Sequence, residues 1–189
     1  VVQTMIHHPT DSSLLADGVR VLSRLIRRSK PLVQEACAGR RDAFRTRMRT
    51  MRHGLQMLHR LRRRTGDEMA AKRAVVYTRL LAATQATVDQ VERINGALQH
   101  VGVHAKAAHL RGQIAQYLPL VRRVIDQARR RLLGGQKVAA AEKVVSLFEP
   151  HTRIIPRHKG GAAVEFGRLV VFDEVEGGIV TRFAVLADK

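Results

Sequence analysis

The chain has 189 residues, 45% of them hydrophobic and 26% charged, which is enough for one ordinary core or for one domain with an insertion. Its 34 lysines and arginines stand against 16 acidic residues, and the net charge of +18 indicates a polyanionic partner. No apolar run is long enough to span a membrane, so no membrane partner is expected. The single cysteine, Cys37, excludes an internal disulfide and fits a cytoplasmic location.

The positive charge is concentrated between Arg20 and Arg64, where 15 lysines and arginines face two acidic residues and leave a local charge of +13. Aromatic residues make up only 4% of the chain, and tryptophan is absent. A stacking surface for single-stranded bases is therefore disfavoured. Contact with the phosphate backbone of a duplex is the better interpretation of this composition.

Apolar residues recur at spacings of three and four along four segments, which predicts four amphipathic helices with antiparallel, coiled-coil-like packing. The first helix is expected to begin with Asp11 as its N-cap and to end or reset at Pro31. Turns at residues 65–67 and at Gly102 separate the later helices, and glycines 134–135 end the fourth. The predicted apolar seams are, in chain order, Leu15, Val19, Leu22 and Ile26; Phe44, Met48, Met51, Leu55 and Leu58; Val76, Leu80, Ala83, Thr87, Val91, Ile94 and Leu98; and Leu110, Ile114, Tyr117, Val121, Ile125, Ala128 and Leu132.

The hydrophobic period changes after the fourth helix. A short helix is expected over residues 138–147, one strand over 164–172 and another over 179–186. Residues 176–178, with two glycines, supply a hairpin turn between the two strands. A lone hairpin is marginally stable in water, so these strands are expected to need a sheet that lies mostly outside this chain.

Two groups of residues far apart in the chain carry a family resemblance. The first is Lys143, Ser146 and Glu149-Pro150-His151, followed by Lys159-Gly160 and then Glu165-Phe166-Gly167. The second is the run Ile6-His7-His8-Pro9-Thr10-Asp11-Ser12-Ser13-Leu14-Leu15. Together they resemble the core of DDE-type insertion-sequence transposases, most closely the ISNCY-like group, whose core carries a long helical insertion.

The resemblance implies an α+β fold that forms part of an RNase H-like transposase core. Residues 1–10 would be the tail of the first core strand and its lead-in, 11–148 a basic helical insertion of long antiparallel helices, and 149–189 a loop and β-hairpin of the core. The intact protein would bind the element's terminal repeats and target DNA as a homo-oligomer at the bacterial nucleoid. It would cut and join DNA by two-metal phosphoryl transfer with Mg²⁺.

None of the family's three catalytic carboxylates maps onto residues 1–189, so the chain is expected to be an internal fragment with no catalytic residue and no bound metal of its own. The acids of the second half, Asp173, Glu174 and Glu176, are interpreted as a solvated hairpin turn. His7 and His8 point to opposite faces of an extended segment, and His151 and His158 lack zinc-like spacing. The Glu149-Pro150-His151 motif is interpreted as a helix-to-strand junction.

The second predicted helix carries the candidate DNA-binding residues. A basic helix face is often only a solvated face, but +13 over one region exceeds what solubility needs, and its self-repulsion costs stability. Backbone contact with DNA is therefore favoured, without a particular groove. A membrane surface is a weaker partner because the apolar seam lacks aromatic anchors. The candidates are Arg45, Arg49, Arg52, Arg60, Arg62, Arg63 and Arg64.

Two other classes of function stay open. One is a non-catalytic basic helical module that binds nucleic acid and carries an accessory hairpin. The other is a helical-bundle interaction protein, for which salt-insensitive behaviour and no DNA affinity would be expected. Carboxylate-bearing segments encoded on both sides of this one, between inverted repeats, would favour the transposase.

Overall fold

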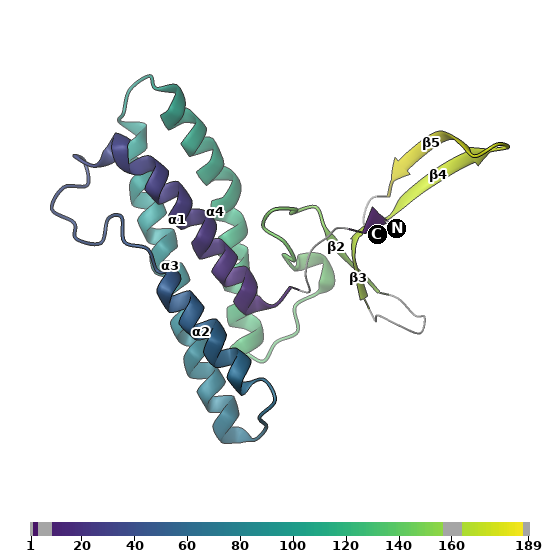
Figure 1. The fold of residues 1–189 in the computed structure, drawn as a ribbon, viewed down its shortest axis with the longest axis horizontal. Coiled ribbons are helices and arrows are strands. Elements are labelled where there is room, and N and C mark those ends of the chain that lie inside the picture. The colour runs from purple at the N-terminus through teal and green to yellow at the C-terminus, as the bar shows by residue number, and fades with distance from the viewer. Residues whose placement is uncertain (1, 4–8, 157–163, 187–189) are drawn as a thin grey trace. The chain divides into compact units, whose positions relative to one another are not determined.

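The computed structural model describes residues 2–3, 9–156 and 164–186 and has an α+β fold (Figure 1). Over this part of the chain, four long helices precede two small antiparallel sheets, apart from the short strand β1 (Val2–Gln3) at the start. The residues group into two compact units. One is the helical unit, Thr10–Lys137, and the other is the strand unit, formed by Val1–Pro9 with Val138–Lys189. Residues 138–148, which the sequence placed with the helices, therefore group with the strands.

The helical unit consists of α1 (Asp11–Val33), α2 (Met48–Leu61), α3 (Asp67–Gln99) and α4 (Ala105–Leu132). The four helices predicted from the apolar periodicity are thus confirmed. Figure 1 shows α1 and α3 running in the same direction, with α2 and α4 running against them. The expected antiparallel packing holds for α1 with α4 and for α2 with α3. In contrast, α1 and α3 pack in parallel, because the chain reverses direction at each successive helix.

The predicted seams of α1 and α3 form the core of the helical unit. Every position of those two seams is less than 10% exposed, and Leu80 is fully buried. The seam of α2 is shifted: Met51 is fully buried and Leu61 is buried, whereas Leu55 and Leu58 are only half-buried. Phe44 lies in the turn before α2, since that helix begins at Met48.

The N-terminus of α1 corrects one expectation. Thr10, not Asp11, is the N-cap: the Thr10 hydroxyl oxygen accepts from the Ser13 amide at 3.1 Å, and the Ser13 hydroxyl oxygen accepts from the Thr10 amide at 3.0 Å. This reciprocal pair is a capping box. It provides side-chain acceptors for backbone amides at the start of the helix, so the Asp11 carboxylate is available to bind another partner. Pro31 also does not end the helix, because in the last turn it removes only one backbone hydrogen bond, and α1 continues to Val33.

The Asp11 carboxylate of α1 binds two residues of α4. Its side chain is 4% exposed and accepts from Gln127 Nε2 at 2.9 Å and from an Arg131 guanidinium nitrogen at 2.6 Å. Residue 11 opens α1 while residues 127 and 131 lie near the end of α4, so these bonds fix the antiparallel register of the two helices. A buried carboxylate is tolerated only with such partners.

Tyr77 of α3 borders this polar cluster. It shares a hydrogen bond with Ser12, and burial raises the pKa of its phenol above the usual value of 10 because the charged phenolate is poorly solvated there. The nearby Asp11 charge raises this pKa further, while the Ser12 hydrogen bond and the Arg131 charge act in the opposite direction. The phenol therefore stays neutral in the folded chain to a higher pH than in the unfolded chain.

The strand unit corrects two expectations. Residues 138–147 contain only the short 3-10 turn η1 (Ala140–Glu142), because Val144, Val145 and Leu147 are all buried and follow one another too closely for one face of a helix. The strand predicted over 164–172 is divided at Leu169 into β3 (Val164–Arg168) and β4 (Val170–Val175), which pair in different sheets.

The two sheets are small and antiparallel. The first has the order β1-β3-β2, with β2 spanning Arg153–Pro156, and places Ile154 opposite Phe166. The second is the predicted hairpin of β4 and β5 (Ile179–Val185), closed by a turn in which Gly177 and Gly178 adopt φ of 93° and 78°. Apolar side chains of this hairpin are exposed, with Phe183 at 70%. The need for a further sheet stays a prediction.

Tyrosinate absorbance can test the environment of Tyr77. The chain has two tyrosines and no tryptophan, so the variant Tyr117→Phe leaves Tyr77 as the sole titrating chromophore. We expect its midpoint in the folded protein to lie above the midpoint of the same variant unfolded in guanidinium, which should be close to 10. Since the folded pKa is the higher one, the phenol's contribution to stability is fully present below about pH 10 and is lost as the pH rises through the folded value. Coincident midpoints would contradict the burial.

Candidate nucleic-acid interface

The packing of α2 on α3 determines which face of α2 points outward. Gly54 lies so close to α3 that a Cβ placed on it would be 2.5 Å from Leu80 Cδ2, closer than side-chain atoms approach in folded proteins. Met51 and Leu61 are buried on the same side of the helix. The contact requires glycine because the two helices approach closely there. Most of the opposite side of α2 consequently faces away from α3.

That outward side carries the basic residues. Arg49, Arg52, His53, Gln56 and Arg60 are all exposed and recur at intervals of three and four, so they form one stripe along the helix. The stripe lies opposite Gly54 and its apolar neighbours around the helix axis. With 14 residues, α2 is about 21 Å long. The same face therefore presents guanidinium groups over roughly the length of six base pairs of duplex DNA.

All seven candidate arginines are exposed. Arg45 lies in the loop before α2, three others lie on the helix, and Arg62, Arg63 and Arg64 follow its end. The chain has no acidic residue between Asp42 and Asp67. Within the described ranges, no ion pair joins any of these seven guanidinium groups to a carboxylate. We name this set, together with His53, the basic face of α2.

The other helices show the usual arrangement of surface charge. Arg20 pairs with Asp17 on α1 at 3.0 Å, and Lys72 pairs with Glu68 on α3 at 2.6 Å. Each partner lies one turn away, which is the spacing that stabilises a solvated helix face. The basic face of α2 has no such partners. It differs from the other faces in the number of unpaired arginines that lie on one short segment of the described chain.

Helix stability does not account for the arginines near the start of α2 either. The N-terminus of α2 has Arg47 at the N-cap without a side-chain capping bond, and its first turn contains no acid. Positive charge there opposes the helix dipole, at a cost of some tenths of a kcal/mol per residue, although Arg60 in the last turn is favourable. The close α2–α3 contact, not the charge pattern, holds this helix in place.

The turn after α2 is anchored from α3. A guanidinium nitrogen of Arg73 donates to the Arg64 carbonyl at 2.8 Å and to the Leu61 carbonyl at 3.3 Å. Gly66, with φ of 100°, then caps α3. These bonds fix the backbone of the turn. Its three consecutive arginines are thus displayed from a defined position at the end of the basic face.

A hollow of about 310 Å³ lies beside the basic face, between α2 and α3. Its floor is apolar and its rim is cationic. Arg79 of α3 joins the rim, although the sequence did not single it out; its position next to Leu80 in the α3 seam is the signal that places it beside α2. The residues that line the hollow are Arg49, Thr50, His53, Gly54, Met57, Val76, Arg79 and Leu80.

The remaining candidates are not brought together. Asp173 and Glu174 lie exposed on β4, and Glu176 lies in the hairpin turn. Among the described residues, no group of three or more histidines, cysteines or carboxylates could hold a metal ion. His151 is exposed in a turn, whereas His7, His8 and His158 fall outside the described residues.

The Glu149-Pro150-His151 motif forms a turn that leads into β2. The Ser146 hydroxyl oxygen accepts from the amides of Phe148 and Glu149 at 3.2 and 3.1 Å, and the amide of buried Thr152 donates to the Glu149 carbonyl at 3.0 Å. The motif thus leads into a strand, as predicted, but the residues directly before it, 143–148, are not helical.

Comparison of the chain with protein-family models, with curated proteins and with solved structures finds no match. No helix in the described part of the chain is both long enough and apolar enough to cross a bilayer.

Two glycine substitutions test the close contact of α2 with α3. We expect Gly54→Ala to lower the free energy of unfolding by about 1–3 kcal/mol, because the new methyl group overpacks against Leu80. Gly96→Ala on α3 is the matched control, since its Cβ meets no atom within 4 Å. It should raise stability by about 0.5–1 kcal/mol through helix propensity alone. Urea unfolding of both variants gives the comparison, and equal effects would rule out the close packing.

Proposed function

We propose that the helical unit binds the phosphate backbone of duplex DNA through the basic face of α2. The observation that carries this proposal is the row of exposed guanidinium groups without a carboxylate partner in the described ranges. Like charges gathered on one short segment repel one another, and a bound polyanion would remove that repulsion. Because backbone contacts carry no sequence information by themselves, the expected binding has no sequence preference.

The geometry supports a contact of several phosphates. Duplex DNA carries one charge per about 1.7 Å of its axis, so a face about 21 Å long lies within reach of more phosphates than it has arginines. The anchored turn that follows α2 extends the face beyond the helix end. Low aromatic content and the absence of tryptophan argue against base stacking as the source of affinity.

The salt dependence of binding tests this proposal. If about six phosphates are neutralised, affinity for a short duplex should fall on the order of 10³-fold between 50 and 200 mM salt. The triple variant Arg52→Glu, Arg60→Glu and Arg63→Glu should abolish binding at low salt while its helix content by circular dichroism stays unchanged. Fluorescence anisotropy with two duplexes of different sequence gives the affinities. A flat salt response would refute the proposal.

A matched variant separates the basic face from bulk charge. Lys106, Arg111 and Arg129 are exposed on α4, and their reversal to glutamate changes the net charge by the same amount. This control should retain most of the low-salt affinity. If it loses as much affinity as the α2 triple variant, the binding is a property of net charge and not of the basic face.

The wider context of this DNA contact is proposed from the motif resemblance: the chain is a segment of a DDE-type insertion-sequence transposase with an RNase H-like core. Topology supports it. Val2 pairs with Arg168, and Gln3 with Gly167, so β1 joins β3 in one sheet although the whole helical unit separates them in the chain. A long helical insertion between neighbouring core strands is what the resemblance implies. In the intact transposase, carboxylates outside residues 1–189 would hold Mg²⁺ for strand transfer.

The alternative is a stand-alone basic module that binds nucleic acid without catalysis. It is favoured by one observation, the compactness of Thr10–Lys137 as a unit of its own. Sequencing the genomic DNA on both sides of this segment distinguishes the two. The transposase proposal expects an aspartate-bearing strand encoded upstream, aspartate and glutamate segments downstream, and inverted repeats that enclose them. Coding sequence in the same reading frame on both sides that lacks these carboxylates would contradict the transposase proposal.

A further inference from the structure

The segment between α1 and α2 is held against α3 by a buried glutamine. Gln90 is 1% exposed, and its Nε2 donates to the carbonyls of Asp42 and Ala43 at 2.9 and 2.6 Å. Its Oε1 accepts from a guanidinium nitrogen of Arg47 at 2.6 Å. One side chain of α3 thus satisfies two loop carbonyls and an arginine at once, so this part of the loop has a defined position over α3.

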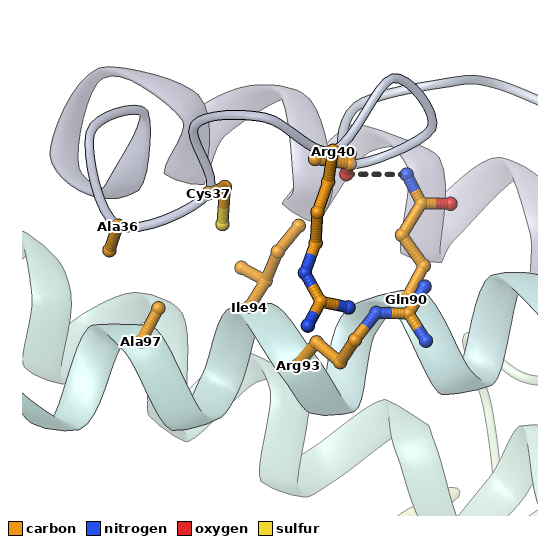
Figure 2. A pocket seen from close by; sticks show the side chains of 8 residues that line it. Ala36, Cys37, Arg40, Gln90, Arg93, Ile94 and Ala97 are labelled. Carbon is orange, nitrogen blue, oxygen red and sulfur yellow. Dashed lines mark hydrogen bonds between the residues drawn. The ribbon is translucent and has the colours of Figure 1, made fainter.

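The loop and α3 enclose a pocket of about 220 Å³ (Figure 2). Figure 2 shows the Arg40 side chain reaching from the loop towards α3, where Arg93 also lines the pocket. Small and apolar side chains complete the walls. The pocket is lined by Ala36, Cys37, Arg40, Ala43, Gln90, Arg93, Ile94 and Ala97.

The charges around this pocket are unevenly matched. Arg40 makes no ion pair with any described carboxylate, and Arg93 has only Asp42, at 3.8 Å, a long contact between half-exposed groups that contributes little. Burial lowers the pKa of neighbouring Arg47; the charges of Arg45 and Arg93 lower it further, while Asp42 and Asp89 oppose them.

We propose that this pocket binds a phosphate-type oxyanion between the guanidinium groups of Arg40 and Arg93. Two like charges that face one cavity repel each other, and an anion between them removes that repulsion. The guanidinium fork matches the oxygen geometry of phosphate with two parallel hydrogen bonds. The volume is several times that of one water, about 30 Å³, so an oxyanion and bridging water fit.

The phosphate group that binds in the pocket can belong either to a free phosphate compound or to the backbone of a bound duplex. The proposal does not rest on the basic face of α2, because the two sites share no arginine. Asp42 is the nearby carboxylate that would oppose an anion. Its side chain is 52% exposed, so it can turn to solvent when the pocket is occupied.

Cys37 provides a local probe, because it is the chain's only cysteine and lines the pocket. The test measures the rate of Cys37 alkylation by neutral iodoacetamide in sodium phosphate and in sodium chloride of equal ionic strength. Phosphate should slow the reaction, by about two-fold when half the pockets are occupied, since the bound state shields the thiol. A second arm adds a short duplex in chloride buffer at low salt.

Arg40→Gln should remove the protection, whereas Arg41→Gln, with the same charge change at an exposed neighbour that does not line the pocket, should keep it. Protection by inorganic phosphate supports a free oxyanion as ligand, and protection by the duplex alone supports a backbone phosphate. The proposal is overturned by equal rates in phosphate, chloride and duplex, or by protection that persists in Arg40→Gln. The α2 triple variant should keep phosphate protection even though it loses DNA affinity, so failure of one proposal is distinguishable from failure of the other.

Discussion

The close approach of α2 to α3 at Gly54 and Leu80 is the contact on which the orientation of the basic face of α2 depends. Without a side chain at residue 54, the two backbones come near enough for Met51 and Leu61 to be buried between them. The rotation of α2 about its axis is then determined. Its arginines point outward for this reason and not because charge places them there. A helix that packed through Leu55 and Leu58 instead would present a different set of arginines.

The N-terminal motif of α1 has a structural role in the helical unit. Thr10 and Ser13 cap the helix reciprocally, which frees the Asp11 carboxylate to bind Gln127 and Arg131 on α4. These bonds tie the beginning of the helical unit to its end. The motif therefore specifies the register of α1 with α4, and its loss would loosen the scaffold that carries the basic face.

Charge in the helical unit divides into paired and unpaired groups. Arg20 of α1, Lys72 of α3 and Arg130 of α4 each pair with a carboxylate one turn away, and Arg122 of α4 pairs with Glu92 of α3. Arg47 is held inside by Gln90. The basic face of α2 gathers seven arginines on one short segment, and none of them makes an ion pair with a carboxylate in the described ranges. The basic face and the Arg40 pocket both lie beside α3.

The sequence by itself determined the features that depend on neighbouring residues. The three- and four-residue spacing of apolar residues such as Leu80 predicted four helices and most of their buried positions. The two glycines at residues 177–178 predicted the hairpin turn. Both signals come from residues close together in the chain. The exposure of all seven candidate arginines also followed from their place off the apolar seam. The transposase resemblance and the DNA contact stay predictions.

Only the tertiary structure decided the features that depend on distant partners. Thr10 and not Asp11 is the N-cap of α1, since the Asp11 carboxylate accepts hydrogen bonds from two donors on α4. The tertiary structure divided the strand at Leu169, because β3 and β4 find different neighbours. It also brought Arg93 beside Arg40, from residues more than 50 positions apart, since Gln90 holds the loop over α3. Such choices rest on competition among distant groups for hydrogen bonds and space, which no local pattern of residues records.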